Sequence, residues 1–129
     1  AEKIISQAIA LRDQNSGNKN RSILKTAVDF IDSHYMEEDM SLNKAANAAN
    51  VSANHFSALF SQNMGQTFIE YLTNLRMNKA KEYLRCTSMR SSEIAGEIGY
   101  KDAHYFSYLF KKTQGMTPSD YRKAREDKA

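Results

Sequence analysis

Three histidines, one cysteine and a short run of acids are the side chains that could support catalysis or bind a metal. His34, His55 and His104 lie far apart in the chain, and Cys86 has no second cysteine to pair with. Nucleophilic catalysis and zinc binding both need such groups side by side, and no HExxH, CxxC, GxSxG or phosphate-binding glycine motif occurs. The acids "EED" at 37–39 are typical of a solvated connecting loop. The sequence therefore predicts no enzyme, no metal site and no cofactor.

The richest chemistry lies in "GYKDAHYFSYLFKKTQGMTP", residues 99–118, which combines tyrosines, phenylalanines, a histidine and two lysines. Such side chains can contact bases and phosphates or fill a core, so their placement around a helix matters. At about 100° per residue, one face is predicted to pack inward: Tyr105, Phe106, Leu109, Phe110 and Thr113. The other face is predicted to point outward: Ala103, His104, Ser107, Tyr108 and Lys111.

An earlier segment repeats this pattern. Adding 50 to the residue number aligns Phe56 with Phe106, Phe60 with Phe110, Gly65 with Gly115, Thr67 with Thr117, and Tyr71 with Tyr121. The first copy is predicted to bury His55, Phe56, Leu59 and Phe60. It is predicted to expose Asn54, Ser57, Ala58 and Ser61. A packed core histidine is thus expected at position 55, whereas His104 is expected to point outward.

Helices must position these side chains, and the hydrophobic periodicity predicts seven of them and no strand after residue 22. Their expected starts are marked by capping residues: Ser41, Ser52, Thr67, Ser91 or Ser92, Asp102, and Thr117 followed by Pro118. An amphipathic helix at 2–14 and a flexible break at 15–20 are expected upstream. Cys86, near the end of the longest helix, is expected to be a small buried residue.

Both copies of the repeat have the features of a helix-turn-helix. Ala46 and Ala95 supply the small side chain that a close helix crossing favours. Asn50 and Gly99 fall where the turn needs a left-handed backbone, which glycine accepts freely and asparagine tolerates. We therefore expect an N-terminal helix and linker at 1–21 and a body at 22–129. Within the body we expect helix-turn-helix units at 41–65 and 91–115, a linker helix at 67–86 and a final helix at 117–126.

Composition and charge fit a helical nucleic-acid-binding domain without establishing one. The 129 residues are 41% apolar and 26% charged, with one proline and five glycines, and the net charge is +3. Residues 67–129 carry 12 basic against 8 acidic side chains, whereas residues 1–66 carry 6 against 7. No membrane span or signal peptide is recognisable, and the single cysteine favours a reducing, cytoplasmic setting. Because the chain begins with alanine, we expect a fragment of a longer protein.

Three motifs carry a family resemblance: "FxxxxGxTFxxYLxxLR" at 60–76, "SEIAxEIGY" at 92–100 and "YFSxLFKKxxGMTPSDYR" at 105–122. From Ser41 to about Arg122 the chain resembles the DNA-binding domain of the AraC/XylS family of bacterial transcription regulators. The resemblance implies an all-α, homeodomain-like fold with two helix-turn-helix units joined by a long helix. Each unit would place a recognition helix in one of two successive major grooves. A helix of about 19 residues spans roughly 28 Å, slightly less than the ~34 Å between such grooves, which favours bent DNA.

The resemblance turns the outward faces into candidate DNA contacts. The candidates for reading bases are Asn54, Ser57, Ala58, Ser61, Ala103, His104, Ser107, Tyr108 and Lys111. The candidates for binding phosphates are Ser41, Lys44, Thr67, Arg76, Lys112 and Thr117. One departure matters: "FSQN" at 60–63 lacks the basic pair that the family often has there. We therefore expect the first unit to attract phosphates less than the second, which keeps Lys111 and Lys112.

The expected partners follow from the same resemblance. They are double-stranded DNA, a regulatory domain N-terminal to the module, and RNA polymerase; no membrane is expected. "NRSILKTAVDFIDSHY" at 20–35 resembles the entry to such modules in two-component response regulators, which favours a phospho-receiver domain over a sugar-binding cupin domain. The alternative, from a different class of function, is a helical protein-interaction module with weakened or lost DNA binding. It is suggested by the first recognition helix, which lacks basic side chains.

Overall fold

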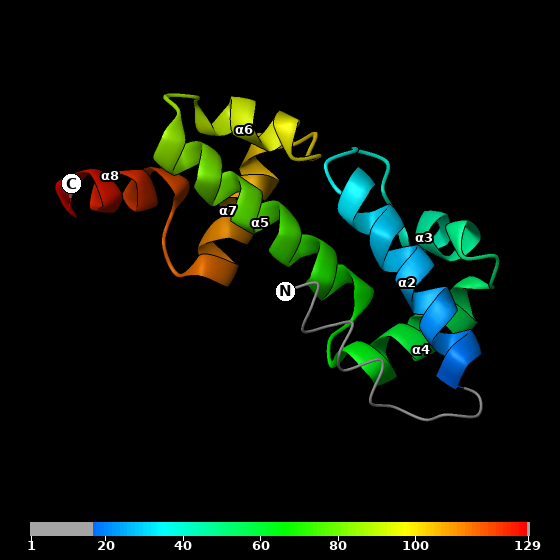
Figure 1. The fold of residues 1–129 in the computed structure, drawn as a ribbon. Coiled ribbons are helices and arrows are strands. Elements are labelled where there is room, and N and C mark those ends of the chain that lie inside the picture. Colours follow the sequence, from blue (N-terminus) through cyan, green and yellow to red (C-terminus); the bar gives the residue numbers. More distant parts are fainter. Residues whose placement is uncertain (1–16, 129) are drawn as a thin grey trace. The chain divides into compact units, whose positions relative to one another are not determined.

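The computed structural model describes residues 17–128, and every regular element in that part is a helix (Figure 1). The helices are α2 Gly17–His34, α3 Leu42–Ala48, α4 Ala53–Met64, α5 Phe68–Cys86, α6 Ser91–Glu97, α7 Ala103–Gln114 and α8 Pro118–Lys128. The all-α fold with two helix-turn-helix pairs, α3–α4 and α6–α7, is therefore confirmed. The amphipathic helix predicted at 2–14 lies outside the described residues.

The first described helix begins earlier than the sequence suggested. α2 starts at Gly17, so residues 17–20 of the predicted flexible break are helical. One glycine costs a helix only about 1 kcal/mol relative to alanine, and packing of the rest of the helix can offset this cost. Leu24, Ala27 and Ile31 are fully buried and hold α2 in place. The polar residues before them therefore continue the helix instead of interrupting it.

The described residues form two compact units, each with its own core. Unit 1 comprises α2, α3, α4 and the start of α5 as far as Leu72. Unit 2 comprises the rest of α5 from Thr73, then α6, α7 and α8, together with the Tyr35–Asp39 segment. The helix α5 is thus shared between the two units, because its first residues complete one core and its later residues begin the other.

Aromatic rings from α4 and α5 form the centre of the core in unit 1. Phe56 and Phe60 are fully buried, and their ring centroids lie 5.5 Å apart. Phe60 also lies 5.5 Å from Tyr71 in an edge-to-face arrangement, which the ring quadrupoles favour. The Tyr71 hydroxyl donates to Asp32 Oδ1 at 2.8 Å, so a hydrogen bond joins α5 to α2.

Unit 2 repeats this arrangement with the corresponding residues. Phe106 and Phe110 are fully buried with centroids 5.9 Å apart, and Phe110 meets Tyr121 edge to face at 5.9 Å. The Tyr121 hydroxyl accepts from Arg85 Nη1 at 3.2 Å, where Tyr71 donates to a carboxylate. The ring geometry is conserved between the two copies, whereas the polarity of the tyrosine hydrogen bond is reversed.

The repeat extends into the helix that precedes each helix-turn-helix. Core positions of α2 recur in α5 with a spacing of 53 residues: Leu24 and Met77, Ala27 and Ala80, Ile31 and Leu84. Asp32 and Arg85, the partners of the two tyrosines, follow the same spacing. The later part of α5 therefore has the same packing role in unit 2 that α2 has in unit 1.

The turns of the two helix-turn-helix pairs have the expected backbone. Asn50 has φ 60° and Gly99 has φ 104°, both in the left-handed region. Ala46 and Ala95 are each 1% exposed, and their carbonyl oxygens accept from the N–H groups of Val51 at 3.1 Å and Tyr100 at 2.8 Å. The paired small residues therefore allow the close crossing that the sequence predicted.

Helix starts agree with the sequence at five positions and differ at one. The side chains of Ser41, Ser52, Thr67, Asp102 and Thr117 accept hydrogen bonds from backbone N–H groups of the next helix. The expected serine cap of α6 is wrong, because Ser91 and Ser92 are already helical and Arg90 precedes them. Glu93 accepts there from the Arg90 N–H at 2.9 Å, so a carboxylate inside the first turn replaces a serine cap.

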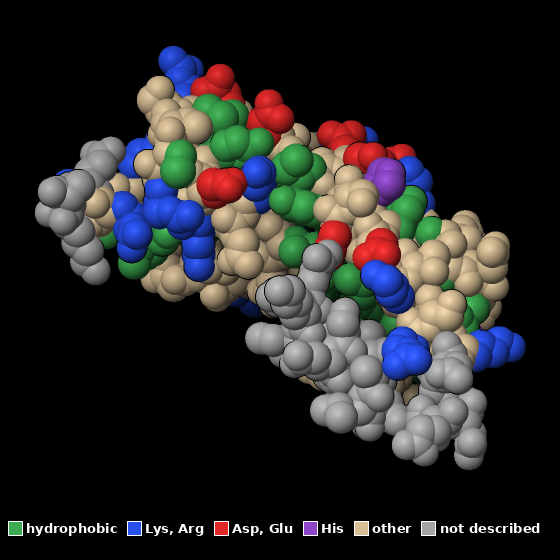
Figure 2. Space-filling view, viewed as in Figure 1, with side chains coloured by type: hydrophobic (Ala, Val, Ile, Leu, Met, Phe, Trp, Pro, Cys, Tyr) green, Lys and Arg blue, Asp and Glu red, His purple; other side chains and the backbone are tan. Residues whose placement is uncertain are grey.

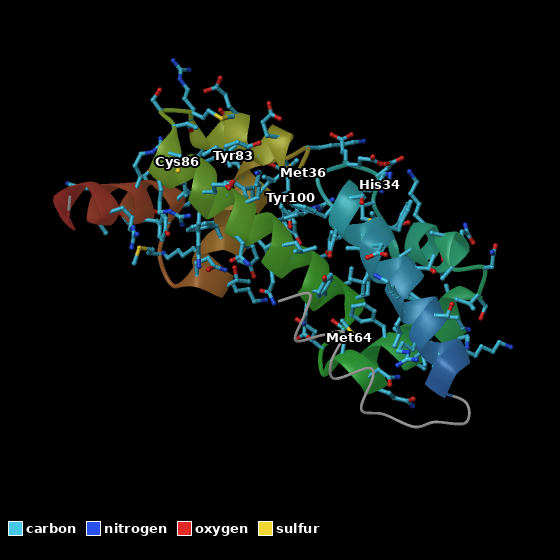
Figure 3. All side chains as sticks on the ribbon, viewed as in Figure 1. His34, Met36, Met64, Tyr83, Cys86 and Tyr100 are labelled. Atoms are coloured by element: carbon cyan, nitrogen blue, oxygen red, sulfur yellow. The ribbon has the colours of Figure 1, made fainter. Side chains whose placement is uncertain are left out.

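The predicted burial of Cys86 is also wrong. Cys86 is exposed at the last residue of α5, where Figure 3 labels it. The buried face of α5 ends at Leu84, which is 3% exposed. Arg122 closes this end of the helix by donating to the carbonyl oxygens of Leu84 at 3.1 Å and Thr87 at 2.9 Å. A cation beside terminal carbonyls is favourable for the helix dipole.

Candidate nucleic-acid interface

In unit 1 the candidate interface is the outer face of α4, the second helix of the first helix-turn-helix. Ser52 caps this helix by accepting from the His55 N–H at 3.1 Å, and Gly65 ends it with φ 72°. Phe56 and Phe60 hold its inner side in the core. The exposed side chains of the helix are Asn54, His55, Ala58 and Gln62. None of its 12 residues is Lys, Arg, Asp or Glu.

In unit 2 the corresponding surface is the outer face of α7. Asp102 Oδ1 caps this helix by accepting from the N–H groups of His104 at 2.8 Å and Tyr105 at 3.4 Å. The exposed side chains are His104, Tyr105, Tyr108, Lys111, Lys112 and Thr113. Tyr105 is 49% and Tyr108 59% exposed, so both aromatic rings present much of their surface to water. This face is therefore aromatic and basic.

The exposed faces of α4 and α7 are rotated in the same direction relative to the prediction. His55 and Tyr105, predicted to pack inward, are exposed, as is Thr113. Ser57, Ser61 and Ser107, predicted to point outward, are half-buried. Ala103 packs against the core of unit 2 instead of facing outward. The two buried phenylalanines of each helix define its inner side, and on a wheel the centre of the exposed side then falls at Ala58 and Tyr108.

These corrections have a common physical reason. The sequence assignment grouped residues by hydrophobicity, so an aromatic ring beside a phenylalanine was placed inside. A tyrosine carries a polar hydroxyl and tolerates partial exposure, whereas alanine and serine are small enough to lie close to a neighbouring helix. Asn54, Ala58, His104, Tyr108 and Lys111 remain exposed candidates for base contacts.

Arg76 is the one phosphate candidate that the structure places inside. It is only 6% exposed, and it donates from Nε to the carbonyl oxygen of Tyr35 at 2.7 Å and from Nη2 to that of Glu37 at 2.8 Å. Its guanidinium also lies 4.8 Å from the ring centroid of Tyr100. The side chain is therefore hydrogen-bonded inside unit 2 rather than exposed for a phosphate contact. These two bonds give the buried guanidinium and the two backbone carbonyl groups the hydrogen-bond partners that buried polar groups require.

Gly99 leaves the space that this buried arginine side chain occupies. A Cβ atom at Gly99 would lie 2.7 Å from Arg76 Nη2, and the backbone there has φ 104°. Glycine is thus required both by the turn and by the close approach of the guanidinium. Burial raises the pKa of the neighbouring Tyr100, against the opposing influence of Arg76. Figure 3 labels Tyr100, which lies beside α5.

The remaining phosphate candidates are spread over the two units. Ser41, Lys44 and Thr67 belong to unit 1, and Lys112 and Thr117 belong to unit 2. The hydroxyls of the serine and the two threonines already accept hydrogen bonds as caps. Lys112 is exposed, with its ammonium 5.8 Å from the Tyr108 ring centroid. Each unit therefore carries its own subset of these candidates.

An aromatic row on unit 2 was missed by the sequence analysis. The ring centroids of Tyr100 and Tyr105 lie 5.8 Å apart, and those of Tyr105 and Tyr108 lie 6.5 Å apart. Lys112 continues the row through its contact with Tyr108. The spacing of 105, 108 and 112 on one helix could have indicated this row, because residues three and four apart are neighbours on a helix surface.

Basic side chains also gather elsewhere on unit 2. Figure 2 shows Lys and Arg side chains together where α8 meets the end of α5. The Lys81 ammonium lies 6.0 Å from the Tyr121 ring centroid, and Arg85 donates to the Tyr121 hydroxyl. Because Tyr121 packs on the buried Phe110, this patch is separated from the exposed face of α7 by the core.

Two kinds of site are not found among residues 17–128. In the described part of the chain, no three His, Cys, Asp or Glu side chains are grouped so that they could hold a metal ion. Within the same residues, no helix is both long and apolar enough to cross a membrane.

A family model described as a helix-turn-helix domain matches residues 45–124. The C-terminal domain of AraT, a response regulator from Geobacillus stearothermophilus, has a similar structure: TM-score 0.78 and 40% identity, covering 80% of this chain and 85% of that one. The DNA-binding domain of AdpA, solved in complex with a target DNA, shares the fold with TM-score 0.76 at 21% identity, covering 83% of this chain and 95% of that one.

A similar sequence belongs to the lactose operon transcription activator of Staphylococcus xylosus. It is 36% identical over 99 residues, which are 77% of this chain and 35% of the activator. The chain spans 12% to 38% of the lengths of the first three curated relatives that it matches, all of which are named as transcription regulators or activators.

Proposed function

Because this chain belongs to the AraC-type helix-turn-helix family, we propose that residues 22–129 bind double-stranded DNA sequence-specifically and regulate transcription. The observation that carries the proposal is the outer face of each recognition helix. Two buried phenylalanines fix α4 and two fix α7, so each helix presents a defined row of exposed side chains. A helix of this kind fits the major groove of B-DNA, where the base edges are read.

The exposed side chains support different contacts in the two half-sites. On α4, Asn54 can pair with adenine, and the Ala58 methyl can pack against a thymine methyl. On α7, His104 and Lys111 can donate to the acceptors of guanine, and Lys112 can bind phosphate. We infer that two recognition helices occupy successive major grooves and that the α7 half-site contributes most of the phosphate attraction.

A salt titration tests the proposal. The protein is mixed with a fluorescent pool of duplexes whose central sequence is randomised, and bound duplexes are enriched over several rounds. Affinity for the enriched duplex should exceed affinity for the starting pool, and both should fall steeply as ionic strength rises, because bound cations release counterions from DNA. Binding that is undetectable at low salt over the whole pool would instead favour the protein-interaction module, for which the uncharged α4 face is the supporting observation.

We further infer that the module works as an output domain without chemistry of its own, in the bacterial cytoplasm where the chromosome lies. Its likeness to the C-terminal domain of a response regulator supports a phospho-receiver domain over a sugar-binding cupin domain as the regulatory partner. In the full-length protein, a small phosphoryl donor such as acetyl phosphate should change the affinity for the enriched duplex. A response to sugars and none to the donor would overturn that pairing.

RNA polymerase is the remaining proposed partner. A transcription regulator that acts at a promoter must alter the recruitment or the activity of polymerase. Transcription reconstituted from purified polymerase and a promoter carrying the enriched duplex should therefore change when the protein is added. An unchanged transcript level, with the duplex occupied, would argue against this partnership.

A further inference from the structure

Tyr105 is the least expected feature of the exposed α7 face. A buried position was predicted for it, yet 49% of the side chain is exposed beside Tyr108, which is 59% exposed. Exposing two neighbouring aromatic side chains leaves apolar surface in water, which is unfavourable unless a partner covers it. Their hydroxyl groups are hydrogen-bond donors that an exposed position keeps accessible.

The ring of Tyr105 is supported from beneath. Its centroid lies 5.8 Å from that of Tyr100 in an edge arrangement, and Tyr100 in turn stacks on the fully buried Phe106 at 6.1 Å. The Arg76 guanidinium, held by two backbone carbonyl groups, lies over the Tyr100 ring, 4.8 Å from its centroid. The row therefore begins in the core of unit 2 and ends at the surface, with the Tyr105 ring packed against Tyr100.

The row carries the chemistry that a phosphate backbone needs. Tyr105 and Tyr108 each offer a hydroxyl donor, and Lys112 adds an ammonium 5.8 Å from the Tyr108 ring. On the helical wheel, Tyr105 and Lys112 lie on one flank of the exposed face, about 100° and 80° from His104. His104 and Lys111 lie on the other flank. An α-helix in a groove has bases in front of it and a sugar-phosphate strand on each side.

We propose that Tyr105 and Lys112 form a backbone row, which contacts the sugar-phosphate backbone of one DNA strand, with Tyr100 and Arg76 as positioning residues beneath Tyr105. The proposal rests on the DNA-binding function proposed above. It keeps Tyr108, at the centre of the exposed face, as a base-contact candidate, and it gives Tyr105 a function that its predicted burial excluded. The base edges are left to His104, Tyr108, Lys111 and the corresponding part of α4.

Tyr105→Phe and Tyr105→Ala test this assignment against the duplex enriched with the wild-type protein. Both should weaken binding, by roughly tenfold for Tyr105→Ala, because a hydrogen bond to a charged phosphate is lost. The loss should be equal for the enriched duplex and for single-base variants of it, since backbone contacts carry no sequence information. Ile69→Ala, which removes another exposed apolar side chain at a distance from this row in the sequence, should leave affinity unchanged.

Lys112→Gln provides a second, electrostatic readout. It should lower the slope of log affinity against log salt by about one unit, whereas Tyr105→Phe should leave the slope unchanged because tyrosine is neutral. Lys101→Gln is the matched control, since it removes an exposed lysine whose ammonium pairs with Glu38 at 3.6 Å. Lys101→Gln should change both the slope and the affinity less than Lys112→Gln does.

The outcomes separate this inference from the proposed function. If the wild-type protein binds no duplex, both fail. If it binds, and the Tyr105 variants bind equally well with unchanged melting temperature, the backbone row is refuted while DNA binding stands. A loss confined to one base position would also refute it, because that pattern marks base reading. If Tyr105→Ala melts lower, Tyr105→Phe decides, since it keeps the ring and removes only the hydroxyl.

Discussion

The recognition helices α4 of unit 1 and α7 of unit 2 have the same length and the same buried phenylalanine pair, yet their exposed faces differ. α4 bears no charged side chain, whereas α7 bears Lys111 and Lys112 and two exposed tyrosines. Inside, the ring pairs have centroid distances of 5.5 and 5.9 Å. Close packing constrains the buried positions, so the copies agree there, and the solvent-facing positions are free to differ.

The tyrosine hydrogen bonds show a second difference of the same kind. Tyr71, 6% exposed, donates to Asp32, whereas Tyr121, half-buried, accepts from Arg85. The two rings pack alike on the preceding phenylalanine. Packing against the phenylalanine thus fixes the place of each tyrosine ring. The hydrogen-bond partner of the tyrosine hydroxyl can be either a carboxylate or a guanidinium.

Truncating the central phenylalanines should have the largest effect and tests whether the two cores are equivalent. Phe56→Ala and Phe106→Ala should each destabilise by about 3–5 kcal/mol, because a fully buried ring leaves a cavity. Amide hydrogen exchange followed by mass spectrometry should show the loss of protection in unit 1 for the first variant and in unit 2 for the second. Equal loss in both units from either variant would show that the cores do not act separately.

The turn residues should give the next largest effect, and an asymmetric one. Gly99→Ala should destabilise by about 2 kcal/mol or more, because a left-handed alanine is strained and its Cβ would collide with the Arg76 guanidinium. Asn50→Gly, at the equivalent left-handed position, should change stability by less than about 1 kcal/mol. Chemical denaturation monitored by circular dichroism measures both. Similar losses in the two variants would contradict the role assigned to Arg76.

Removing the tyrosine hydroxyls should have a smaller effect, and an unequal one in the two units. Tyr71→Phe should cost about 1–2 kcal/mol, since it removes a part-buried hydrogen bond from the hydroxyl to the charged Asp32 carboxylate. Tyr121→Phe should cost less, because Arg85 is exposed and water can replace the lost acceptor. Urea denaturation of both variants measures the difference. The reverse order would mean that the Arg85 contact stabilises more than its exposure indicates.

The smallest expected effect on the fold, with the clearest effect on binding, comes from the surface charges. Replacing Lys111 and Lys112 together by glutamine should leave the melting temperature nearly unchanged and lower the salt dependence of DNA binding by about two units of slope. Replacing Ser61 and Gln62, the equivalent pair on α4, by alanine should leave the slope unchanged. A slope that depends equally on both pairs would remove the predicted inequality of the half-sites.

Much of the fold could be predicted, because the sequence features that indicate helices, caps and turns are local. Helix periodicity, the caps at Ser52 and Asp102 and the left-handed turns at Asn50 and Gly99 depend on a few neighbouring residues. The fifty-residue repeat made each signal more reliable by presenting it twice. The failures at the interface, His55 and Tyr105, arose because hydrophobicity alone does not fix the direction in which a helix faces its core.

The sequence by itself determined the helical class, the two helix-turn-helix pairs and the positions of their buried phenylalanines, since these follow from period, size and backbone preference. Only the tertiary structure decided which residues face outward on α4 and α7, and that Arg76 is buried against Tyr100. The orientation of a helix depends on contacts with residues distant in the chain: Phe110, for instance, packs on Tyr121, and Arg76 reaches the carbonyl group of Tyr35. Such contacts leave no local mark in the sequence.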